Sequence, residues 1–240
     1  MNNIYVYGRN VAKELLKNKK VIKKAYLMNG FKEDEILNLL NINNICIEYL
    51  DKRQLDKLED GNHQGIILQI EDYKYLNLND MLNDLPENPF IVILDHLEDP
   101  HNFGAIIRTC EAAGVHYIVI PKDRSVSINS TVMKTSVGAL DNVKIVMVTN
   151  LNACINELKK NGVWIVGTDM ENSSCYDEID YKTPTALVIG SEGFGMSNLV
   201  KKNCDFIAKI PMNGKINSLN ASVAAGIMIY EVVRQRKTGV

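Results

Sequence analysis

Polar side chains that could act on a ligand follow the apolar run FIVILD at residues 90–95. Asn102 and Arg108 stand six residues apart in the next stretch, DPHNFGAIIRT at residues 99–109. Asparagine is a favoured helix N-cap, so we expect Asn102 to cap a helix over 103–113. An arginine close to the apolar stripe of that helix needs a partner, so Arg108 could bind an anion. These residue types are equally compatible with a capped helix whose arginine extends to solvent.

A glycine-rich stretch, LVIGSEGFGMS at residues 187–197, follows a second apolar run. Its glycines permit unusual backbone angles and let a ligand approach the main chain; they are Gly190, Gly193 and Gly195. The spacing is not that of a P-loop, because a methionine stands where the lysine should be, nor is it the GxGxxG of dinucleotide-binding proteins. Glu192 would repel a phosphate, which favours a ligand that is neutral or cationic near the loop. A sharp turn between strand and helix is the simpler alternative.

A third polar loop follows the last apolar run, in IPMNGKINSLNASVAAGIMIYE at residues 210–231. We expect Ser218 to cap a long helix that begins near Leu219. Ser218 and Asn220 would then add a hydroxyl and a carboxamide at one strand end. The helix begins with small residues, which permit close packing within the chain or against a second subunit.

The elements between these loops predict an α/β protein with a mainly parallel sheet. From Phe90 onward the strand patterns are uninterrupted apolar runs, which indicate strands buried on both faces. Ligands of such sheets bind beyond the carboxyl ends of the strands, where the three polar loops lie. We expect a small α/β domain over 1–71, a linker with one short helix over 72–89, and the main domain over 90–240.

Composition limits the class of protein. Hydrophobic content of 46% and charged content of 23% are ordinary for a soluble globular protein. The five cysteines form no CxxC pair and the four histidines add no metal-ligand spacing, so we expect reduced thiols and no metal. No apolar run approaches the ~18–20 residues of a membrane span, and no signal-peptide pattern begins the sequence. We therefore expect a cytoplasmic protein without a membrane partner.

The charge is slightly acidic overall and uneven along the chain. A net charge of −2 and a pI of about 6.1 argue against a protein that is basic over its whole surface, as many nucleic-acid-binding proteins are. Residues 1–24, however, carry seven lysines and arginines, Arg9 and Lys23 among them, against the single acid Glu14. This excess could contact phosphates, or it could be a solvated helix face.

Taken together, the three loops resemble the three motifs of the SpoU/TrmH family of RNA 2′-O-ribose methyltransferases, within the SPOUT superfamily. DPHNFGAIIRT is similar to the first motif, LVIGSEGFGMS to the second and IPMNGKINSLNASVAAGIMIYE to the third, in the right order and spacing. YGRNVAKELL and HQGIIL resemble the ends of the ribosomal-protein-like substrate-binding domain of the RlmB branch, which methylates a guanosine of 23S ribosomal RNA. The resemblance implies a C-terminal SPOUT domain with a deep trefoil knot, S-adenosyl-L-methionine as cofactor, and a homodimer.

The same resemblance implies roles for individual residues. The positions that match the catalytic set are Asn102, Arg108, Glu192, Ser218 and Asn220. The positions that match contacts to the cofactor, or lie beside them, are Thr168, Gly190, Ile210, Met212 and Leu219. Apart from the resemblance, the uneven charge leads us to expect Arg9 and Lys23 to contact RNA, together with Arg108.

We expect Arg108 to act on the RNA rather than as a base, because a guanidinium is essentially always protonated. It would bind phosphate and stabilise the developing alkoxide, held in place by Asn102 and Glu192. Ser218 and Asn220 would shape the pocket.

The substrate and the class of protein have alternatives. The separate N-terminal domain favours ribosomal RNA, and a tRNA guanosine methyltransferase is the alternative substrate assignment. A non-catalytic RNA-binding protein on the same fold is a second alternative. A nucleotide-binding enzyme such as a dehydrogenase is a third, against which the lack of an early GxGxxG argues.

Overall fold

The chain folds as two compact units. The computed structural model describes residues 4–17, 21–71, 73–171, 173–215 and 218–237. Unit 1 is Met1–Lys74 with Ile128–Lys134, and unit 2 is Tyr75–Ser127 with Thr135–Val240. Unit 1 therefore takes in most of helix α6, Ser130–Ser136, which is distant from it in the sequence.

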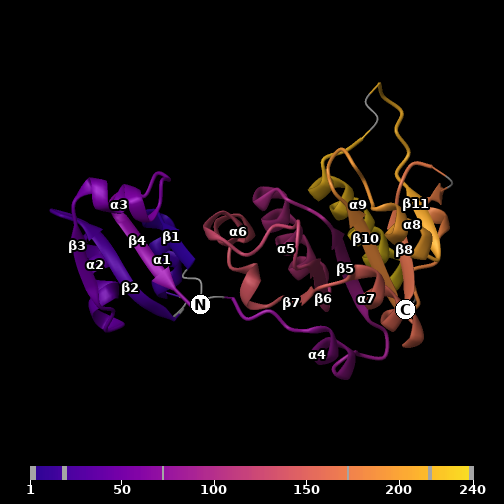
Figure 1. Cartoon of the computed structure of the whole chain (residues 1–240), viewed down its shortest axis with the longest axis horizontal. Coiled ribbons are helices and arrows are strands. Elements are labelled where there is room, and N and C mark those ends of the chain that lie inside the picture. The colour runs from indigo at the N-terminus through magenta and orange to yellow at the C-terminus, as the bar shows by residue number, and fades with distance from the viewer. Residues whose placement is uncertain (1–3, 18–20, 72, 172, 216–217, 238–240) are drawn as a thin grey trace. The chain divides into compact units, whose positions relative to one another are not determined.

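Unit 1 is an α/β domain built on a four-stranded sheet in the order β1-β4-β2-β3 (Figure 1). Its strands are β1, Ile4–Tyr7; β2, Ile22–Met28; β3, Ile47–Leu50; and β4, Ile66–Ile70. Its helices are α1, Arg9–Lys17; α2, Asp34–Ile42; and α3, Lys52–Leu58. Leu16 of α1 and Leu40 of α2 are buried in one core with Leu27 and Leu68 of the sheet. This burial explains the apolar spacing of both helices.

Unit 2 is built on a sheet of seven strands in the order β7-β6-β5-β10-β8-β11-β9, and each neighbouring pair is parallel. The strands are β5, Phe90–Asp95; β6, Tyr117–Pro121; β7, Lys144–Val148; β8, Trp164–Thr168; β9, Ser174–Cys175; β10, Thr185–Gly190; and β11, Phe206–Lys209. The α-helices are α4, Leu78–Asn83; α5, Pro100–Ala113; α7, Leu151–Lys160; α8, Asn198–Asn203; and α9, Ala221–Lys237. Short 3₁₀ turns are Ala139–Asp141 and Tyr176–Glu178. The predicted α/β fold with a mainly parallel sheet is confirmed.

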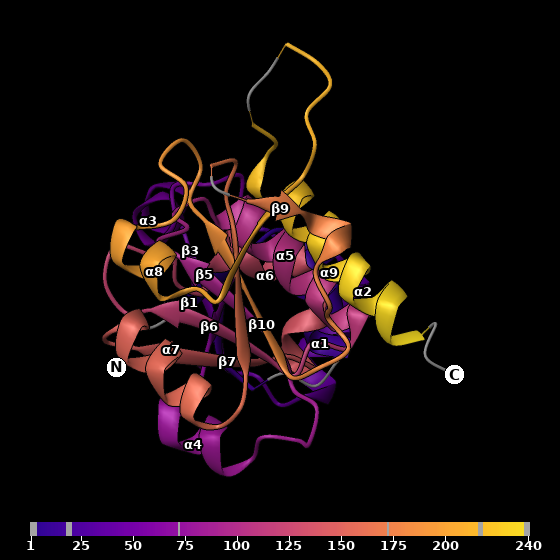
Figure 2. The same ribbon diagram turned by 90° about the vertical axis from the view of Figure 1, so that its right-hand side faces the viewer.

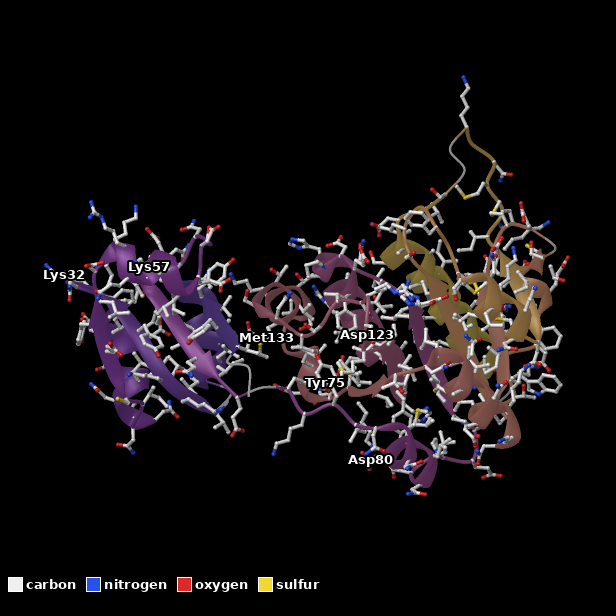
Figure 3. All side chains as sticks on the ribbon, in the orientation of Figure 1. Lys32, Lys57, Tyr75, Asp80, Asp123 and Met133 are labelled. Atoms are coloured by element: carbon white, nitrogen blue, oxygen red, sulfur yellow. The ribbon has the colours of Figure 1, made fainter. Side chains whose placement is uncertain are left out.

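Helices cover both faces of this sheet. Figure 2 shows α5 and α9 on one face and α7 and α8 on the other. Side chains fill the space between the helices and the sheet (Figure 3). The central strands β5, β6 and β10 are buried on both faces, which explains why their sequences are continuous apolar runs rather than alternating ones.

The strand order brings separate parts of the sequence together. Strand β10 enters between β5 and β8, and β11 enters between β8 and β9. The loops after β5, β10, β8 and β11 are therefore neighbours at the carboxyl edge, where a parallel sheet binds ligands. The trefoil knot implied by the resemblance stays a prediction.

The segment 73–89, expected to be part of a linker, packs against unit 2 over much of its length. The expected short helix is α4, and its Met81 is fully buried in the core of unit 2. Leu76 pairs with β7: its main-chain N–H donates to the Ile145 carbonyl, and its carbonyl accepts from Met147, each over 2.9 Å. The Asn- and Asp-rich composition of this segment concealed these apolar anchors.

Two helix starts differ from the sequence prediction. Helix α5 begins at Pro100 with Asp99 as its cap, whose carboxylate accepts from the His101 main-chain N–H over 2.9 Å. Helix α9 begins at Ala221 with Asn220 as its cap, rather than Ser218. Asp99 and Asn220 are of residue types that are as favourable at the N-cap as the predicted caps, Asn102 and Ser218. Proline is also favoured at the first helical position, which suits a start at Pro100.

No helix in the described ranges is long and apolar enough to cross a membrane. Within those ranges no cluster of His, Cys, Asp and Glu side chains is placed to hold a metal ion. All five cysteines are free thiols.

Candidate functional site

Three polar side chains from separate segments of unit 2 form one hydrogen-bonded cluster at the carboxyl edge of the sheet. Asn220 Nδ2 donates to Asn102 Oδ1 and to Glu192 Oε1, each over 2.9 Å. Asn102 Nδ2 also donates to Glu192 Oε1. The Ala221 main-chain N–H donates to the same oxygen over 3.4 Å. The three loops singled out in the sequence therefore meet in space.

Secondary structure fixes the members of this cluster. Asn102 lies in the first turn of α5 with 6% of its surface exposed. Asn220 Oδ1 accepts from the main-chain N–H groups of Ser222 and Val223, over 3.0 and 3.3 Å, and so caps α9. A carboxylate near a helix N-terminus is stabilised by the helix dipole, and Glu192 lies there. Glu192 Oε2 has no partner among the described residues, so it can accept a hydrogen bond from a ligand.

The glycine-rich loop that carries Glu192 is a tight turn with a fixed base. The Ser191 N–H donates to the Gly195 carbonyl over 3.0 Å, and the Gly195 N–H donates back over 2.9 Å. Gly190 lies against this pair so closely that a Cβ there would stand 2.2 Å from Gly195 C and 2.4 Å from Met196 N. Only glycine fits this close approach of two backbone segments.

Asp95 is a residue of this edge that the sequence reasoning missed. It ends β5 beside Gly190 and is 1% exposed. Asp95 Oδ2 accepts from the Ser197 main-chain N–H over 2.6 Å, and Oδ1 pairs with His96 Nδ1. Asp95 therefore anchors the far end of the glycine-rich loop. The signal was a carboxylate ending an otherwise wholly apolar strand.

The structure does not bring Arg108 or Ser218 into the cluster. Arg108 is exposed, and its guanidinium has no hydrogen bond or ion pair with any described residue. Positions six apart on a helix lie on different sides of it, so Arg108 points away from Asn102. The expectation that Asn102 and Glu192 hold Arg108 is therefore not met within this chain, because both bind Asn220 instead. Ser218 is exposed, and its hydroxyl has no partner among the described residues.

The residues expected near a cofactor lie at the same edge, at the ends of three neighbouring strands. Thr168 ends β8, and its hydroxyl donates to the Val188 carbonyl of β10 over 3.0 Å. Ile210 follows β11 and begins the loop that contains Met212 and Leu219; all three are half-buried. The main-chain N–H groups of Met212 and Leu219 have no partner in the part of the chain that the structure describes. The loop thus offers apolar side chains together with free main-chain donors.

The basic residues expected to contact RNA in unit 1 are largely occupied by carboxylates. Lys13 Nζ lies 2.8 Å from Glu33 and 2.7 Å from Glu35, and Lys17 Nζ lies 2.8 Å from Glu35. Arg9 Nη1 lies 3.0 Å from Glu33. These ion pairs connect α1 to the start of α2. The excess of positive charge in the sequence is therefore mostly neutralised by acids that come later in the chain.

The remaining cations of this segment differ from one another. Lys24 pairs with Glu48 over 2.6 Å. Lys23 is exposed and has no partner among the described residues, so it stays a candidate for contact with phosphate. Lys19 and Lys20 lie outside the described residues.

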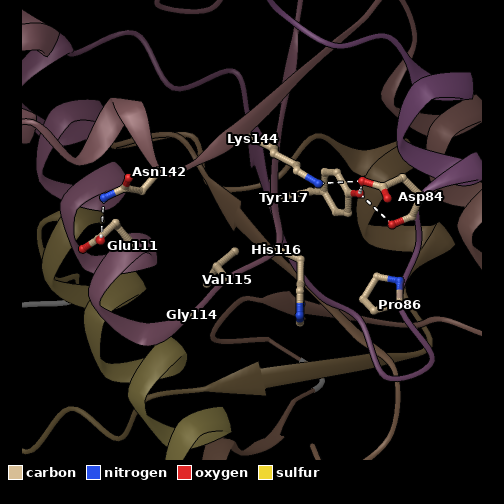
Figure 4. Close-up of a pocket in the computed structure, with 9 residues that line it drawn as sticks. All are labelled: Asp84, Pro86, Glu111, Gly114, Val115, His116, Tyr117, Asn142 and Lys144. Atoms are coloured by element: carbon tan, nitrogen blue, oxygen red, sulfur yellow. Dashed lines mark hydrogen bonds and ion pairs between the residues drawn. The ribbon is translucent and has the colours of Figure 1, made fainter. Parts of the chain in front are cut away.

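A hollow of about 430 Å³ lies at the opposite, amino edge of the unit 2 sheet (Figure 4). Its polar groups are already paired: Asp84 accepts from the Tyr117 hydroxyl over 2.8 Å and binds the Lys144 ammonium over 2.5 Å. The lysine and the tyrosine hydroxyl hold the pKa of Asp84 below its ordinary value. None of the residues expected at the active site lines this hollow, so the carboxyl edge is the candidate site.

Family comparisons agree with this placement. The model of the SpoU rRNA Methylase family matches residues 89–230, and that of RNA 2′-O ribose methyltransferase substrate binding matches residues 5–76. YacO of Bacillus subtilis, whose name assigns it to the TrmH family of tRNA/rRNA methyltransferases, is 44% identical over 97% of this chain and 96% of its own. The chain therefore belongs to the SpoU/TrmH family of RNA methyltransferases, whose methyl donor is S-adenosylmethionine.

Solved structures share the fold. The SpoU methyltransferase AviRb of Streptomyces viridochromogenes, in complex with AdoMet, has a TM-score of 0.78 and 24% identity over 99% of this chain and 92% of its own. An AdoMet-bound rRNA methyltransferase of Sinorhizobium meliloti has a TM-score of 0.77 and 25% identity over 97% of this chain and 87% of its own. The TrmH/SpoU tRNA modifying enzyme of A. aeolicus has a TM-score of 0.58 and 34% identity, over only 68% of this chain and 82% of its own.

The carboxyl edge fits S-adenosylmethionine. A purine edge and an amino-acid moiety need main-chain partners, which the loop with Met212 and Leu219 offers. The sulfonium charge is compatible with the acidic Glu192, whereas a phosphate would be repelled.

Replacing Gly190 with alanine should disturb the site through the backbone. The new Cβ has to displace Gly195 and Met196, and overpacking of this kind costs about 1–3 kcal/mol. We expect the melting temperature of G190A to fall by several degrees. G214A is the matched control, because a Cβ there meets nothing within 4 Å. Equal melting temperatures of G190A and the wild type would show that the loop yields freely.

The ion pairs between α1 and α2 should make unit 1 sensitive to acid. Hydrogen bonds from Lys13, then from Lys17, lower the pKa of Glu35 from its usual value to about 2. A lowered pKa contributes stability above the unfolded value of ~4.5, and this contribution is lost as the pH falls towards 2. We therefore expect hydrogen-exchange protection of α1 and α2 to fall between about pH 5 and pH 2 in the wild type.

E35Q should lack this part of the pH dependence. E14Q is the control, since Glu14 is exposed on α1 without an ion pair among the described residues. A pH profile of E35Q identical to that of the wild type would contradict the assignment.

Proposed function

We propose that this chain transfers a methyl group from S-adenosylmethionine to the ribose 2′-hydroxyl of a guanosine in 23S ribosomal RNA, in the cytoplasm. The observation that supports the choice of RNA is the N-terminal part of unit 1, since a substrate-binding model matches residues 5–76. The rRNA methyltransferase of S. meliloti covers both units, whereas the tRNA modifying enzyme of A. aeolicus covers 68% of the chain. Between these two neighbours, the extra domain is found in the one that is named an rRNA methyltransferase, which supports the ribosomal substrate.

The carboxyl edge would divide the reaction between two groups of residues. Bound S-adenosylmethionine supplies a methyl group on a positively charged sulfur, and we place it against Thr168, Gly190 and the loop from Ile210 through Met212 to Leu219. The cluster of Asn102, Glu192 and Asn220 fixes the positions of three loops relative to one another. A fixed arrangement of these loops helps to align the ribose with the methyl donor. Glu192 Oε2 is free to accept from the ribose hydroxyl, and exposed Ser218 lies in the neighbouring loop.

Arg108 is suited to bind the RNA phosphate. It is exposed, carries a permanent charge and has no internal partner among the described residues. A guanidinium binds phosphate with two parallel hydrogen bonds. This orients the nucleotide in addition to neutralising the charge of its phosphate.

A homodimer fits the surface of α9. Val223 and Tyr230 are about half exposed on this helix, at 50% and 51%, although the rest of it packs against α5 and β10. Residues seven apart share one helix face. We propose that a second copy covers this face.

A tRNA substrate is the second candidate. The name of YacO covers both kinds of RNA, and the A. aeolicus enzyme has the higher identity, 34%, over the part it shares with this chain. A non-catalytic RNA-binding role finds less support, because the hydrogen-bonded cluster of motif residues is intact.

The direct test is transfer of labelled methyl from S-adenosylmethionine to protein-free 23S ribosomal RNA beside tRNA. We expect one alkali-resistant linkage after a guanosine of 23S RNA, because a methylated 2′-oxygen cannot attack the neighbouring phosphate. Label in tRNA alone would move the chain to the other substrate. Cofactor binding without label in either RNA would contradict catalysis on naked RNA.

R108K should separate phosphate binding from simple charge. Lysine keeps the charge and loses the fork of two donors, so we expect kcat/KM to fall by about tenfold or more, and further in R108A. R234K is the control, because Arg234 pairs with Glu231 near the C-terminal end of α9, away from the cluster at the N-terminal end of this helix. Nearly full activity of R108K would exclude bidentate recognition.

A further inference from the structure

Phe194 is the most exposed large apolar side chain in the described part of the protein, at 94%. It stands in the turn after β10, two residues from Glu192 of the hydrogen-bonded cluster. Folding does not bury this ring, so the packing of unit 2 does not explain its presence. The ring stands beside the edge at which the substrate must bind.

With 94% of its surface exposed and a glycine on each side in the sequence, the ring of Phe194 is open to solvent. Gly193 and Gly195 adopt left-handed backbone angles, with φ of +81° and +66°. A Cβ at either glycine would meet nothing within 4 Å. A planar group can therefore approach the ring without first moving a protein side chain.

The base of the turn is nevertheless fixed. The paired main-chain hydrogen bonds of Ser191 and Gly195 close it. Met196, 5% exposed, buries the next side chain in the core, and the Ser197 N–H is held by Asp95. The turn thus holds the aromatic ring on a fixed backbone. The ring is two residues from Glu192 in the sequence.

We infer that Phe194 stacks on an unpaired base of the RNA, next to the nucleotide whose ribose enters the cluster. This inference rests on the proposed function. Proteins recognise single-stranded RNA by stacking splayed bases on exposed aromatic rings. Stacking needs a ring with an open face and a firm support, and Phe194 has both. It needs no positive charge, which suits a protein with a net charge of −2.

A second copy of this chain is a weaker explanation of the exposure. The core of a protein–protein contact is a contiguous apolar patch. Phe194 stands instead between two glycines, with exposed Glu192 and Ser197 close by in the sequence. The half-exposed Val223 and Tyr230 on α9 offer a larger apolar face for a subunit contact.

The test compares four variants by RNA binding, followed with a short single-stranded RNA of mixed sequence that carries 2-aminopurine. Stacking on Phe194 should quench the fluorescence of this base in the wild type and in F194Y. F194L keeps an apolar side chain without a π face, so F194L and F194A should both lose the quench and bind about tenfold more weakly. L199A is the control, since Leu199 of α8 is also exposed, at 59%. It should behave as the wild type.

Each other outcome overturns the inference. Wild-type binding by F194L would mean that apolar area suffices, and wild-type binding by F194A would mean that the ring does not touch RNA. A change of sedimentation coefficient in F194A would assign the ring to a contact between copies. Weaker binding of S-adenosylhomocysteine by F194A would mean that the ring acts through the loop.

Methyl transfer by the wild type is measured separately, so the two proposals fail in different ways. An active wild type whose F194A binds RNA equally well refutes only the stacking. A wild type that binds RNA through Phe194 but transfers no methyl group refutes only the proposed function.

Discussion

The site depends on one carboxylate oxygen that accepts from three directions. Glu192 Oε1 receives hydrogen bonds from Asn102 in α5, from Asn220 at the start of α9, and from the first N–H of that helix. These groups are far apart in the sequence and meet only because β10 lies between β5 and β8. The strand order is thus the condition for the cluster, and the cluster in turn holds the end of α9 against the glycine-rich loop. A change in strand order would leave three polar loops without a common partner.

The same loop is held from its other end by buried charge. Asp95 is 1% exposed, and a carboxylate at such a position is tolerated only if hydrogen bonds replace its water. Ser197 N–H and His96 supply them. Gly190 precedes both anchored residues of the loop, Glu192 and Ser197, in the sequence and lies so close to Gly195 and Met196 that it has no room for a side chain. The loop is therefore fixed at Glu192 and, through Ser197, at Asp95. The exposed side chain between Glu192 and Ser197, that of Phe194, does not contribute to the packing of unit 2. This arrangement suits a reaction that requires alignment of a nucleophile and a methyl donor more than it requires strong acid–base groups.

The sequence predicted the sheet well because uninterrupted apolar runs have few alternatives in a chain of this length. It also located the three loops, since parallel strands place their carboxyl ends at one edge. The sequence could not predict which side chains of the site form hydrogen bonds with one another. Asn102 was expected to cap a helix and, with Glu192, to hold Arg108, yet it binds Glu192 and Asn220. Asn220 was expected to shape the pocket, and it also caps α9. The role of the basic segment was left open for the same reason: Lys13 belongs to that segment in the sequence, but in space it pairs with Glu33 and Glu35.

Exposed cations without an ion pair also stand on unit 2 of the described structure. The basic start of the chain is mostly neutralised within unit 1, whereas Arg108 is exposed and unpaired among the described residues. The side chains of Lys122 and Arg124, in the loop after β6, are also exposed and without partners among those residues. This loop is at the carboxyl edge too, because it follows a parallel strand. A few free cations of this kind give weak, local attraction rather than general affinity for polyanions. An acidic pI is therefore compatible with membership of a family that acts on RNA.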